Sequence, residues 1–483
     1  MSEGGARITN NSPRFRVAPP SASAVHEWHR SLPASIRVLS RSARAALDCD
    51  GDFVVATGHQ SEFFHGGVLA KFIATTEIAR SAARASKWVH FMSDADATDP
   101  FRIDVPCRRT TRDGREELVR ARLHLAGTSR PMPEHAPACT QAARVPRDPQ
   151  THGLTGMHVA SARASSAITR AIACLAESAD APTAAHQGAR AAHSAMRVWV
   201  DTPSATLSTR DLMASPFGSF VVDAILAQPE ACAVAFNRAL AHAPHAARLL
   251  RVDGQSSEVP LWTLDDSGNR ARANAKTAER ARADGKVLLP RAFLASGLMR
   301  LHCDLFVHGT GGERYETAGD FWWREFLGFA PPPCAIATAD LFIAPSTAGL
   351  TGSPPSNLSV PWRAAWWNPT LLERERGLPR ISADRSRIVD ALAASPRRSV
   401  DRRRLYNELM GQIARERASA HDSLASLHET ETRDAASRRA WILARDRTWS
   451  FLFLEPETIT ALSDALRPGA HACAEAWLSG SGR

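Results

Sequence analysis

Residues 53–92 read FVVATGHQSEFFHGGVLAKFIATTEIARSAARASKWVHFM, in which two short apolar runs flank a polar turn and a helical pattern. The first run, Phe53 to Ala56, is apolar and partly β-branched, as expected of a buried parallel strand. The segment from Gly66 to Ala79 places its large apolar residues on one helical face, and Trp88 to Met92 predicts a second strand. Together these segments predict a strand–helix–strand unit with loops at the carboxyl ends of parallel strands, where open sheets bind ligands.

The turn between the first strand and the helix has the clearest chemical pattern, a Thr-Gly-His-Gln run followed after four residues by His-Gly-Gly. Glycines let the backbone approach a ligand, and free amide groups at the start of a helix attract phosphate. Imidazole groups donate hydrogen bonds to phosphate oxygens and stabilise charge that develops there. We therefore predict a phosphate-binding turn made by Thr57, Gly58, His59, Gln60, His65, Gly66 and Gly67.

Two alternatives for this turn remain. It could be an ordinary tight turn with two surface histidines, or the two histidines could ligate a metal ion. A metal site needs further ligands, and the sequence shows no close third ligand next to His59 and His65. We therefore assign no metal site.

An acidic turn follows the second predicted strand and contains Asp94, Asp96 and Asp99. Three carboxylates at this position could hold Mg²⁺, bind an amine, or cap the next helix. Capping explains one aspartate but not three, and we keep all three interpretations open.

A second strand-and-glycine pattern occurs later in the chain. Asp304 to His308 predicts a buried strand, and it ends in a Gly-Thr-Gly-Gly loop. Such a loop would let a ribose or a base rest on bare backbone. Of the neighbouring side chains, Tyr315 is notable because the chain has only two tyrosines. The residues singled out here are Gly309, Gly311, Gly312, Glu313, His308 and Tyr315.

Composition excludes several classes of protein. The apolar and charged contents, 44% and 23%, are those of a globular protein, and no run of about 18 apolar residues predicts a membrane span. The net charge of +9 comes almost entirely from arginines that are scattered among acidic residues, so a solvated surface is favoured over a nucleic-acid interface. Eight cysteines without a CxxC pair argue against a zinc ribbon or a secreted disulfide framework, and we expect a cytoplasmic protein.

The remaining patterns predict an α/β chain of five segments. The first twenty residues lack the apolar core of a secretory signal, and we expect a frayed polar arm. A hairpin is predicted at 108–125, helices at 157–196 and 294–301, strands at 261–264 and 334–338, and amphipathic, coiled-coil-like helices at 405–427 and 432–443. The segments are 1–48 (polar arm and helix), 49–104 (first half of the core), 105–203 (insertion), 204–368 (second half with an inserted hairpin) and 369–483 (C-terminal helical region).

These motifs resemble those of the bacillithiol-biosynthesis cysteine-adding enzymes. In that family a Thr-Gly-Gln-Gln turn precedes a Gly-Gly-Pro-Leu-Tyr helix start, and the matching residues here are Thr57-Gly58-His59-Gln60 and Gly66-Gly67-Val68-Leu69. The family's acidic Glu-Asp-His-Asp turn corresponds to residues 93–96, and its Tyr-Val-Gly-Gly-Pro-Gly-Glu segment corresponds to residues 307–313. Arg291 takes the place of an upstream family arginine. The family is itself similar to class I aminoacyl-tRNA synthetases, but the Lys-Met-Ser-Lys-Ser loop of those enzymes is missing.

The resemblance implies a Rossmann-like parallel sheet core, a connecting insertion and C-terminal helices that form a homodimer. It implies a ligase that joins the carboxyl group of cysteine to the amine of a glucosaminyl malate. Because amide formation needs an activated carboxyl group, we expect a nucleotide (ATP or ADP), with Mg²⁺, in the first crevice. Departures from the family motifs, such as His59 in place of glutamine, favour the alternative of a non-catalytic nucleotide-binding or assembly protein.

We assign catalytic roles to His59, His65, Asp94 and Asp96. Cofactor binding is assigned to Thr57, Gly58, Gln60, Gly66, Gly67, Gly309, Gly311, Gly312 and Glu313. Substrate binding is assigned to Arg291, His308 and Tyr315. The expected partners are small-molecule substrates, without a membrane or a nucleic acid.

Overall fold

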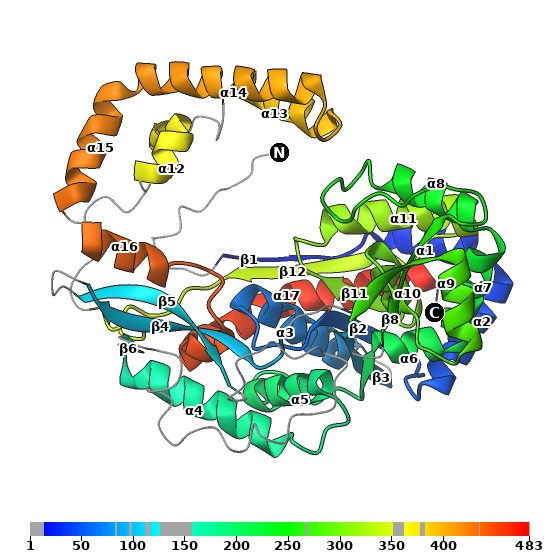
Figure 1. The fold of residues 1–483 in the computed structure, drawn as a ribbon. Helices are drawn as coiled ribbons and strands as arrows, with labels where there is room; N and C mark the ends of the chain where they lie inside the picture. Colours follow the sequence, from blue (N-terminus) through cyan, green and yellow to red (C-terminus); the bar gives the residue numbers. More distant parts are fainter. Residues whose placement is uncertain are drawn as a thin grey trace. The chain divides into compact units, whose positions relative to one another are not determined.

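A six-stranded sheet forms the centre of the larger of two compact units (Figure 1). The computed structural model describes residues 14–82, 85–95, 99–111, 116–125, 157–265, 269–350, 362–376, 382–433 and 435–482. Across the sheet the strands are β1 (Arg14–Ala18), β12 (Cys334–Asp340), β11 (Leu305–His308), β2 (Phe53–Gln60), β3 (Ser86–Ser93) and β7 (Ala205–Ser208).

Five of these strands are parallel, and their order determines where the chain leaves room for a ligand. From β2 the chain moves outward to β3 and β7, and then returns to the other side of β2 to form β11 and β12. The direction of winding therefore reverses between β2 and β11. In open parallel sheets such a reversal opens a crevice at the carboxyl ends of the two strands.

The two faces of the sheet pack against different helices because successive strand residues point to opposite sides. On one face, Val54 and Phe91 belong to a core with Phe217 of α7 (Pro216–Ala227) and Leu298 of α10 (Phe293–Leu301). The other face is covered by α3 (Gly66–Ser81) and α17 (Pro456–Ser481), which lie side by side (Figure 1). The result is an α/β structure with helices on both faces of the sheet.

Helix α3 is buried on all sides, although the sequence predicts one apolar face. All its residues from Gly66 to Ala79 are buried, because the helix lies between the sheet and α17. This environment includes two ionisable side chains, Lys71 and Glu77. Glu77 pairs with Arg80 at 2.7 Å and with Arg467 of α17 at 3.2 Å.

Between β3 and β7 the chain forms the predicted insertion. The predicted hairpin is confirmed as β4 (Arg102–Thr110) and β5 (Glu116–His124). The predicted helices are α4 (Ala162–Glu177) and α5 (Ala184–Met196). They begin later than predicted, because Met157–Val159 forms a third strand, β6, next to β4.

Between β7 and β11 the chain forms helices and a small antiparallel sheet. The helices are α6 (Thr209–Ala214), α7, α8 (Pro229–Ala239), α9 (Ala275–Ala283) and α10, and the sheet has the order β10 (Leu289–Pro290), β8 (Glu258–Leu264) and β9 (Arg270–Asn274). The predicted strand at 261–264 and helix at 294–301 are confirmed. In the described ranges no single helix has the length and apolarity to cross a membrane. Helices α7 and α8 reach that length and apolarity only as a pair, and the chain bends by 103° between them.

The N-terminal prediction is wrong for residues 14–18. These residues form β1, which pairs antiparallel with β12 from Arg14 opposite Asp340 to Ala18 opposite Ile336. A short, charged strand gives little local signal, and the exposed backbone of β12 supplies the hydrogen-bonding partners. Helix α1 (Ala22–Ser31) and helix α2 (Ala34–Ala46) follow, and α1 packs against α17.

The smaller unit comprises residues 106–120 and 345–446. It contains α12 (Trp362–Trp367), a 3₁₀ helix (Pro369–Arg376), α13 (Ala383–Ala394), α14 (Val400–Ser419), α15 (His421–Arg433) and α16 (Ala435–Ala444). The helical prediction for 405–427 is interrupted at Ala420, where α14 ends. The predicted C-terminal segment 369–483 is also divided, because residues 447–483 belong to the larger unit.

Candidate functional site

A cavity of about 660 Å³ lies in the larger unit where β2, β3 and β11 end. This size is within the range of small-molecule sites. The cavity brings together the two glycine-containing segments that the sequence predicted separately, and it lies at the point where the winding of the sheet reverses. The predicted residues that line it are Gly58, His59, Gln60, His65, Gly67, His308, Gly309, Gly311, Gly312 and Tyr315.

The cavity lining is basic. Its described residues include five basic side chains and no aspartate or glutamate. Backbone groups from three glycines of the β11 loop add further hydrogen-bonding capacity. Such a lining favours an anionic ligand, because a bound anion would gain attraction from several sides. The basic residues are His59, His65, Lys71, His308 and Arg447.

His65 forms the N-cap of α3. Its Nδ1 accepts a hydrogen bond from the Gly67 backbone N–H at 3.1 Å. Because Nδ1 is the acceptor, the proton of a neutral ring resides on Nε2. The side chain therefore stabilises the helix start and carries an N–H donor at the end of the helix where anions are favoured.

His59 lies at the end of β2 and is a neutral side chain. Burial, together with the nearby positive charge of Lys71, holds the pKa of His59 well below its usual value. Its Nδ1 donates to the Gln60 carbonyl oxygen at 3.2 Å, so Nε2 carries the lone pair. His59 is thus available as a hydrogen-bond acceptor at neutral pH, and its lowered pKa makes it a weak base that takes a proton only from a strongly acidic donor.

Lys71 is the most deeply buried cation of the cavity. The residue is 4% exposed, and its Nζ donates to the Gly58 carbonyl oxygen at 2.7 Å. Burial lowers the pKa of Lys71 to about 7. The amine is therefore about half protonated at neutral pH.

His308 is held by a buried charge network behind the cavity. Its Nδ1 accepts from the Gly309 N–H at 2.8 Å, and its Nε2 lies 3.2 Å from Glu316 Oε1. Glu316 also contacts Arg300 and accepts a hydrogen bond from Ser296. Burial alone would raise the pKa of Glu316, but Arg300 and His308 lower it to about 2. The ionised carboxylate therefore fixes His308 and, through it, the Gly309 backbone.

Most of the predicted glycines are needed for packing. A Cβ at Gly66 would lie 2.8 Å from Leu341 Cδ1, and one at Gly67 would lie 2.9 Å from the Ala339 carbonyl oxygen. A Cβ at Gly312 would overlap the His308 ring, whereas one at Gly311 would meet no atom within 4 Å. Gly66 and Gly67 thus allow α3 to approach the β12 segment, and Gly311 presents bare backbone to open space. Contacts below about 3 Å at a real Cβ would require the surrounding structure to move.

Several predicted residues lie away from the cavity lining. Thr57 is buried within β2 and donates to the Val307 carbonyl oxygen at 2.8 Å, linking the two central strands. Asp94 is 3% exposed, accepts a hydrogen bond from Thr209 and lies 3.3 Å from Arg210 Nε, so it holds the start of α6. Asp96 and the side chain of Glu313 lie outside the described residues.

The two remaining predictions concern Asp99 and Arg291. Asp99 accepts from the Phe101 N–H at 3.0 Å and pairs with His124 Nε2 at 2.8 Å, which anchors the β4–β5 hairpin. Arg291 Nη2 donates to the Arg248 carbonyl oxygen at 3.1 Å, and its guanidinium lies 5.0 Å from the ring centre of Trp262. Trp262 lines the cavity and Arg291 does not. Arg291 can therefore influence the cavity only through the tryptophan.

The lining residues that were not predicted from the sequence include Lys71, Trp262 and Arg447. A signal for Lys71 exists, because it is one of only four lysines and interrupts an apolar helical run. Arg447 has no such signal, since it joins the cavity from a distant part of the chain. Its Nη1 is held by Asp340 Oδ1 at 2.5 Å, at the end of β12.

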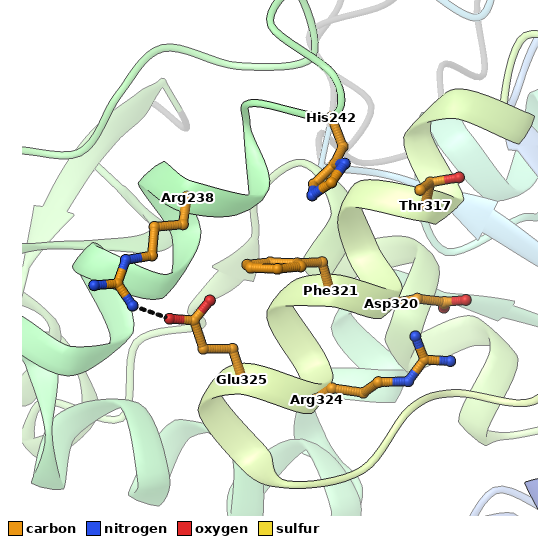
Figure 2. A pocket seen from close by; sticks show the side chains of 7 residues that line it. All are labelled: Arg238, His242, Thr317, Asp320, Phe321, Arg324 and Glu325. Atoms are coloured by element: carbon orange, nitrogen blue, oxygen red, sulfur yellow. Dashed lines mark hydrogen bonds and ion pairs between the residues drawn. The ribbon is translucent and has the colours of Figure 1, made fainter.

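A second cavity, of about 700 Å³, lies between α8 and α11 (Glu313–Leu327). Figure 2 shows Phe321 facing His242, and Arg238 paired with Glu325 at 2.6 Å. Acidic and basic side chains are balanced in its lining. It lies away from the ends of the parallel strands, and we regard the basic cavity as the functional site.

A search of protein-family models finds no match to this chain, and a search of curated protein sequences finds none. Within the described ranges, no group of three or more histidine, cysteine, aspartate or glutamate residues is arranged to hold a metal ion. The described cysteines, from Cys49 to Cys473, are free thiols.

Proposed function

We propose that this protein is a carboxyl-activating ligase that binds the phosphates of a nucleotide in the basic cavity of a Rossmann-like core. The observation that carries the proposal is a lining at the carboxyl ends of β2 and β11 whose described residues include five basic side chains and no acidic one. A 3-2-1-4-5 order of parallel strands, counted along the chain from β2, supports the Rossmann-like assignment. The resemblance to cysteine-adding enzymes supplies the substrate class, an amino acid and a small amine.

The residues present fit a nucleotide phosphate. The open backbone at Gly311 lets a phosphate approach the main chain, and the N-terminus of α3 adds the positive end of its dipole. His65, Lys71 and Arg447 would hold the phosphate oxygens through charge-assisted hydrogen bonds. A bound nucleotide would supply the phosphoryl or nucleotidyl group that makes a carboxyl oxygen a good leaving group.

Other residues of the chain would prepare the acceptor. Because His59 is neutral and has a lone pair on Nε2, it can take a proton from the attacking amine once the attack has made that amine strongly acidic. His308, held by Glu316, would keep the Gly309 backbone in place and so orient the substrate. The buried setting of these groups strengthens their hydrogen bonds relative to those in water.

A second candidate is a non-catalytic nucleotide-binding protein on the same scaffold. It is favoured by the position of Asp94, which was predicted to bind an amine or Mg²⁺ but is engaged by Thr209 and Arg210. In the described residues the cavity therefore has no acidic group for the amino group of a substrate. This candidate predicts nucleotide binding without product formation.

Calorimetry with ATP, ADP and AMP, each with and without Mg²⁺ and cysteine, tests nucleotide binding. We expect saturable binding that His65→Ala weakens about tenfold or more, the effect of losing a hydrogen bond to a charged group. The matched control is His245→Ala at an exposed histidine. Binding of no nucleotide, or equal weakening in both variants, would reject the site.

Turnover separates the two candidates. Protein, ATP, cysteine and an amino-sugar acceptor are incubated together, and release of phosphate or pyrophosphate is measured with amide formation by mass spectrometry. Product that depends on all components supports the ligase. Tight nucleotide binding without any product supports the non-catalytic alternative. The melting temperature of each variant must stay near that of the unmodified protein, so that loss of fold is not counted as loss of function.

A further inference from the structure

Lys71 differs from the other basic residues of the cavity in its surroundings. Its side chain extends from the centre of α3, is almost fully buried, and reaches the end of β2, where Nζ donates to the Gly58 carbonyl oxygen at 2.7 Å. A neutral carbonyl oxygen satisfies one of the three donors of an ammonium group but does not balance its charge. A buried charge without a counter-charge is unfavourable.

Among the described residues, none provides that counter-charge. Neighbouring elements contribute neutral or positive groups toward Lys71, and their buried or half-buried acidic residues are bound to arginines: Asp340 to Arg447, and Glu77 to Arg80 and Arg467. Glu316 is similarly held by Arg300 behind His308. The titratable and charged groups on the packed elements include His59 on β2, His90 on β3, His308 on β11, Asp340 on β12, Arg467 on α17, and Glu77 on α3 itself. Lys87 of β3 lies 3.9 Å from Asp50, and the other charged side chains of α17, Glu457, Asp464, His471 and Glu475, are exposed.

We propose that Lys71 is one of the anion-binding residues of this cavity and that it takes up a proton when the phosphate group of a ligand binds. In the empty cavity the amine donates to the Gly58 carbonyl oxygen, and in the bound state the ammonium adds donors toward the phosphate oxygens. The phosphate supplies the negative charge that the described lining residues lack. Burial, which lowers the pKa of Lys71 to about 7, agrees with a side chain that changes its charge near neutral pH.

The inference rests on the proposed function only in its choice of phosphate as the ligand. Lys71 is a positioning and binding residue in this account, because no bond to it forms or breaks apart from that of the proton. Neighbouring His59 and His65 could also gain protons on anion binding, so the test must read Lys71 itself. The sequence makes this practical, since Lys87, Lys276 and Lys286 are the only other lysines.

Cyanate labelling of the full chain measures the protonation of the Lys71 amine directly. A neutral lysine amine adds to isocyanic acid to give a urea, with no leaving group, and peptide mass spectrometry measures each lysine separately. We expect the ratio of the rate at Lys71 to the rate at the other three lysines to be constant at acidic pH and to fall to half that value near pH 7, because the fraction of neutral amine saturates first at Lys71. Pyrophosphate should suppress labelling at Lys71 alone. A rate at Lys71 that is insensitive to pyrophosphate, or a ratio that starts to fall only above pH 9, would overturn the inference.

Calorimetry of pyrophosphate binding at pH 8, in two buffers of different ionisation enthalpy, measures proton uptake. We expect the unmodified protein to take up close to one more proton per bound pyrophosphate than the Lys71→Met variant does. The variant should bind about tenfold more weakly or worse, as expected from losing a charged hydrogen-bond donor. Equal proton uptake in both proteins would overturn the inference. The labelling experiment uses the unmodified protein and does not depend on whether the variant folds.

The outcomes separate this inference from the proposed function. Pyrophosphate that binds without affecting Lys71 overturns the inference and leaves the ligase proposal standing. Pyrophosphate that protects Lys71, in a protein that forms no amide product, supports the inference and rejects the ligase. Protection by malonate but not by pyrophosphate would reject phosphate as the ligand, and failure of pyrophosphate to bind would overturn both proposals.

Discussion

The pH dependence of stability provides a quantitative test of the core next to the site. His302 follows α10 and is 0% exposed. Its Nδ1 donates to the Leu298 carbonyl oxygen at 2.7 Å, and its Nε2 lies 3.0 Å from Ser215 Oγ. Burial lowers the pKa of His302 to about 4, from 6.5 in an exposed setting. The folded protein therefore contains a neutral histidine over most of the acidic range.

The direction in which stability changes with pH follows from which state of the protein binds the proton. As the pH falls below 6.5, the unfolded chain binds a proton at His302 and the folded chain does not. Stability from this residue is thus complete above pH 6.5 and is lost as the pH falls to about 4. For this pair of pKa values, the free energy of unfolding decreases by about 2 kcal/mol between pH 7 and pH 5.

Urea unfolding at pH 7 and pH 5, followed by tryptophan fluorescence, measures this difference. We expect His302→Gln to reduce the loss of stability between the two pH values by about 2 kcal/mol, whatever its effect at pH 7. The control is His245→Gln, at an exposed position. An unchanged difference in His302→Gln, or an equal change in the control, would show that His302 is not the buried neutral group described.

Two further substitutions test the structures that support the cavity. Glu316→Gln removes the carboxylate whose pKa is lowered from 4.5 to about 2. We expect the free energy of unfolding at pH 7, measured with heat or urea, to decrease by about 3 kcal/mol. An unchanged free energy of unfolding would show that the folded protein does not need this charge beside Arg300. Gly66→Ala should destabilise the protein by about 1–3 kcal/mol, because the added methyl group collides with Leu341. Gly311→Ala, which meets no atom within 4 Å, should leave the melting temperature nearly unchanged; equal effects at the two glycines would contradict the packing argument.

In the larger unit, local sequence patterns predicted the elements that have a regular hydrophobic period. The strand–helix–strand unit of residues 53–92 is found as predicted because its period changes from that of a strand to that of a helix and back. The second strand-and-glycine segment is found for the same reason. By contrast, β1 was predicted as a frayed arm, since a five-residue edge strand gains its stability from pairing with β12 and not from its own composition.

The candidate site was predicted in part. The polar residues and glycines after two strands could be identified because strand ends and helix starts have local signatures. Ten of the predicted residues line one cavity: Gly58, His59, Gln60, His65, Gly67, His308, Gly309, Gly311, Gly312 and Tyr315. Asp94 carried the same kind of signal, and Arg291 was assigned from the family resemblance, yet both are bound elsewhere. Residue type and loop position do not reveal which partner a charged side chain finds in the fold.

The sequence alone determined the class of the fold, the two loops that meet at the sheet edge, and the chemistry of their side chains. These features depend on short-range periodicity and on residue type, which are present in the chain before it folds. Only the tertiary structure decided that Lys71 is buried with no acidic partner among the described residues, that Arg447 joins the cavity, and that Asp94 does not. Burial and pairing of charges depend on contacts between distant parts of the chain, because desolvation and Coulomb interactions act through space.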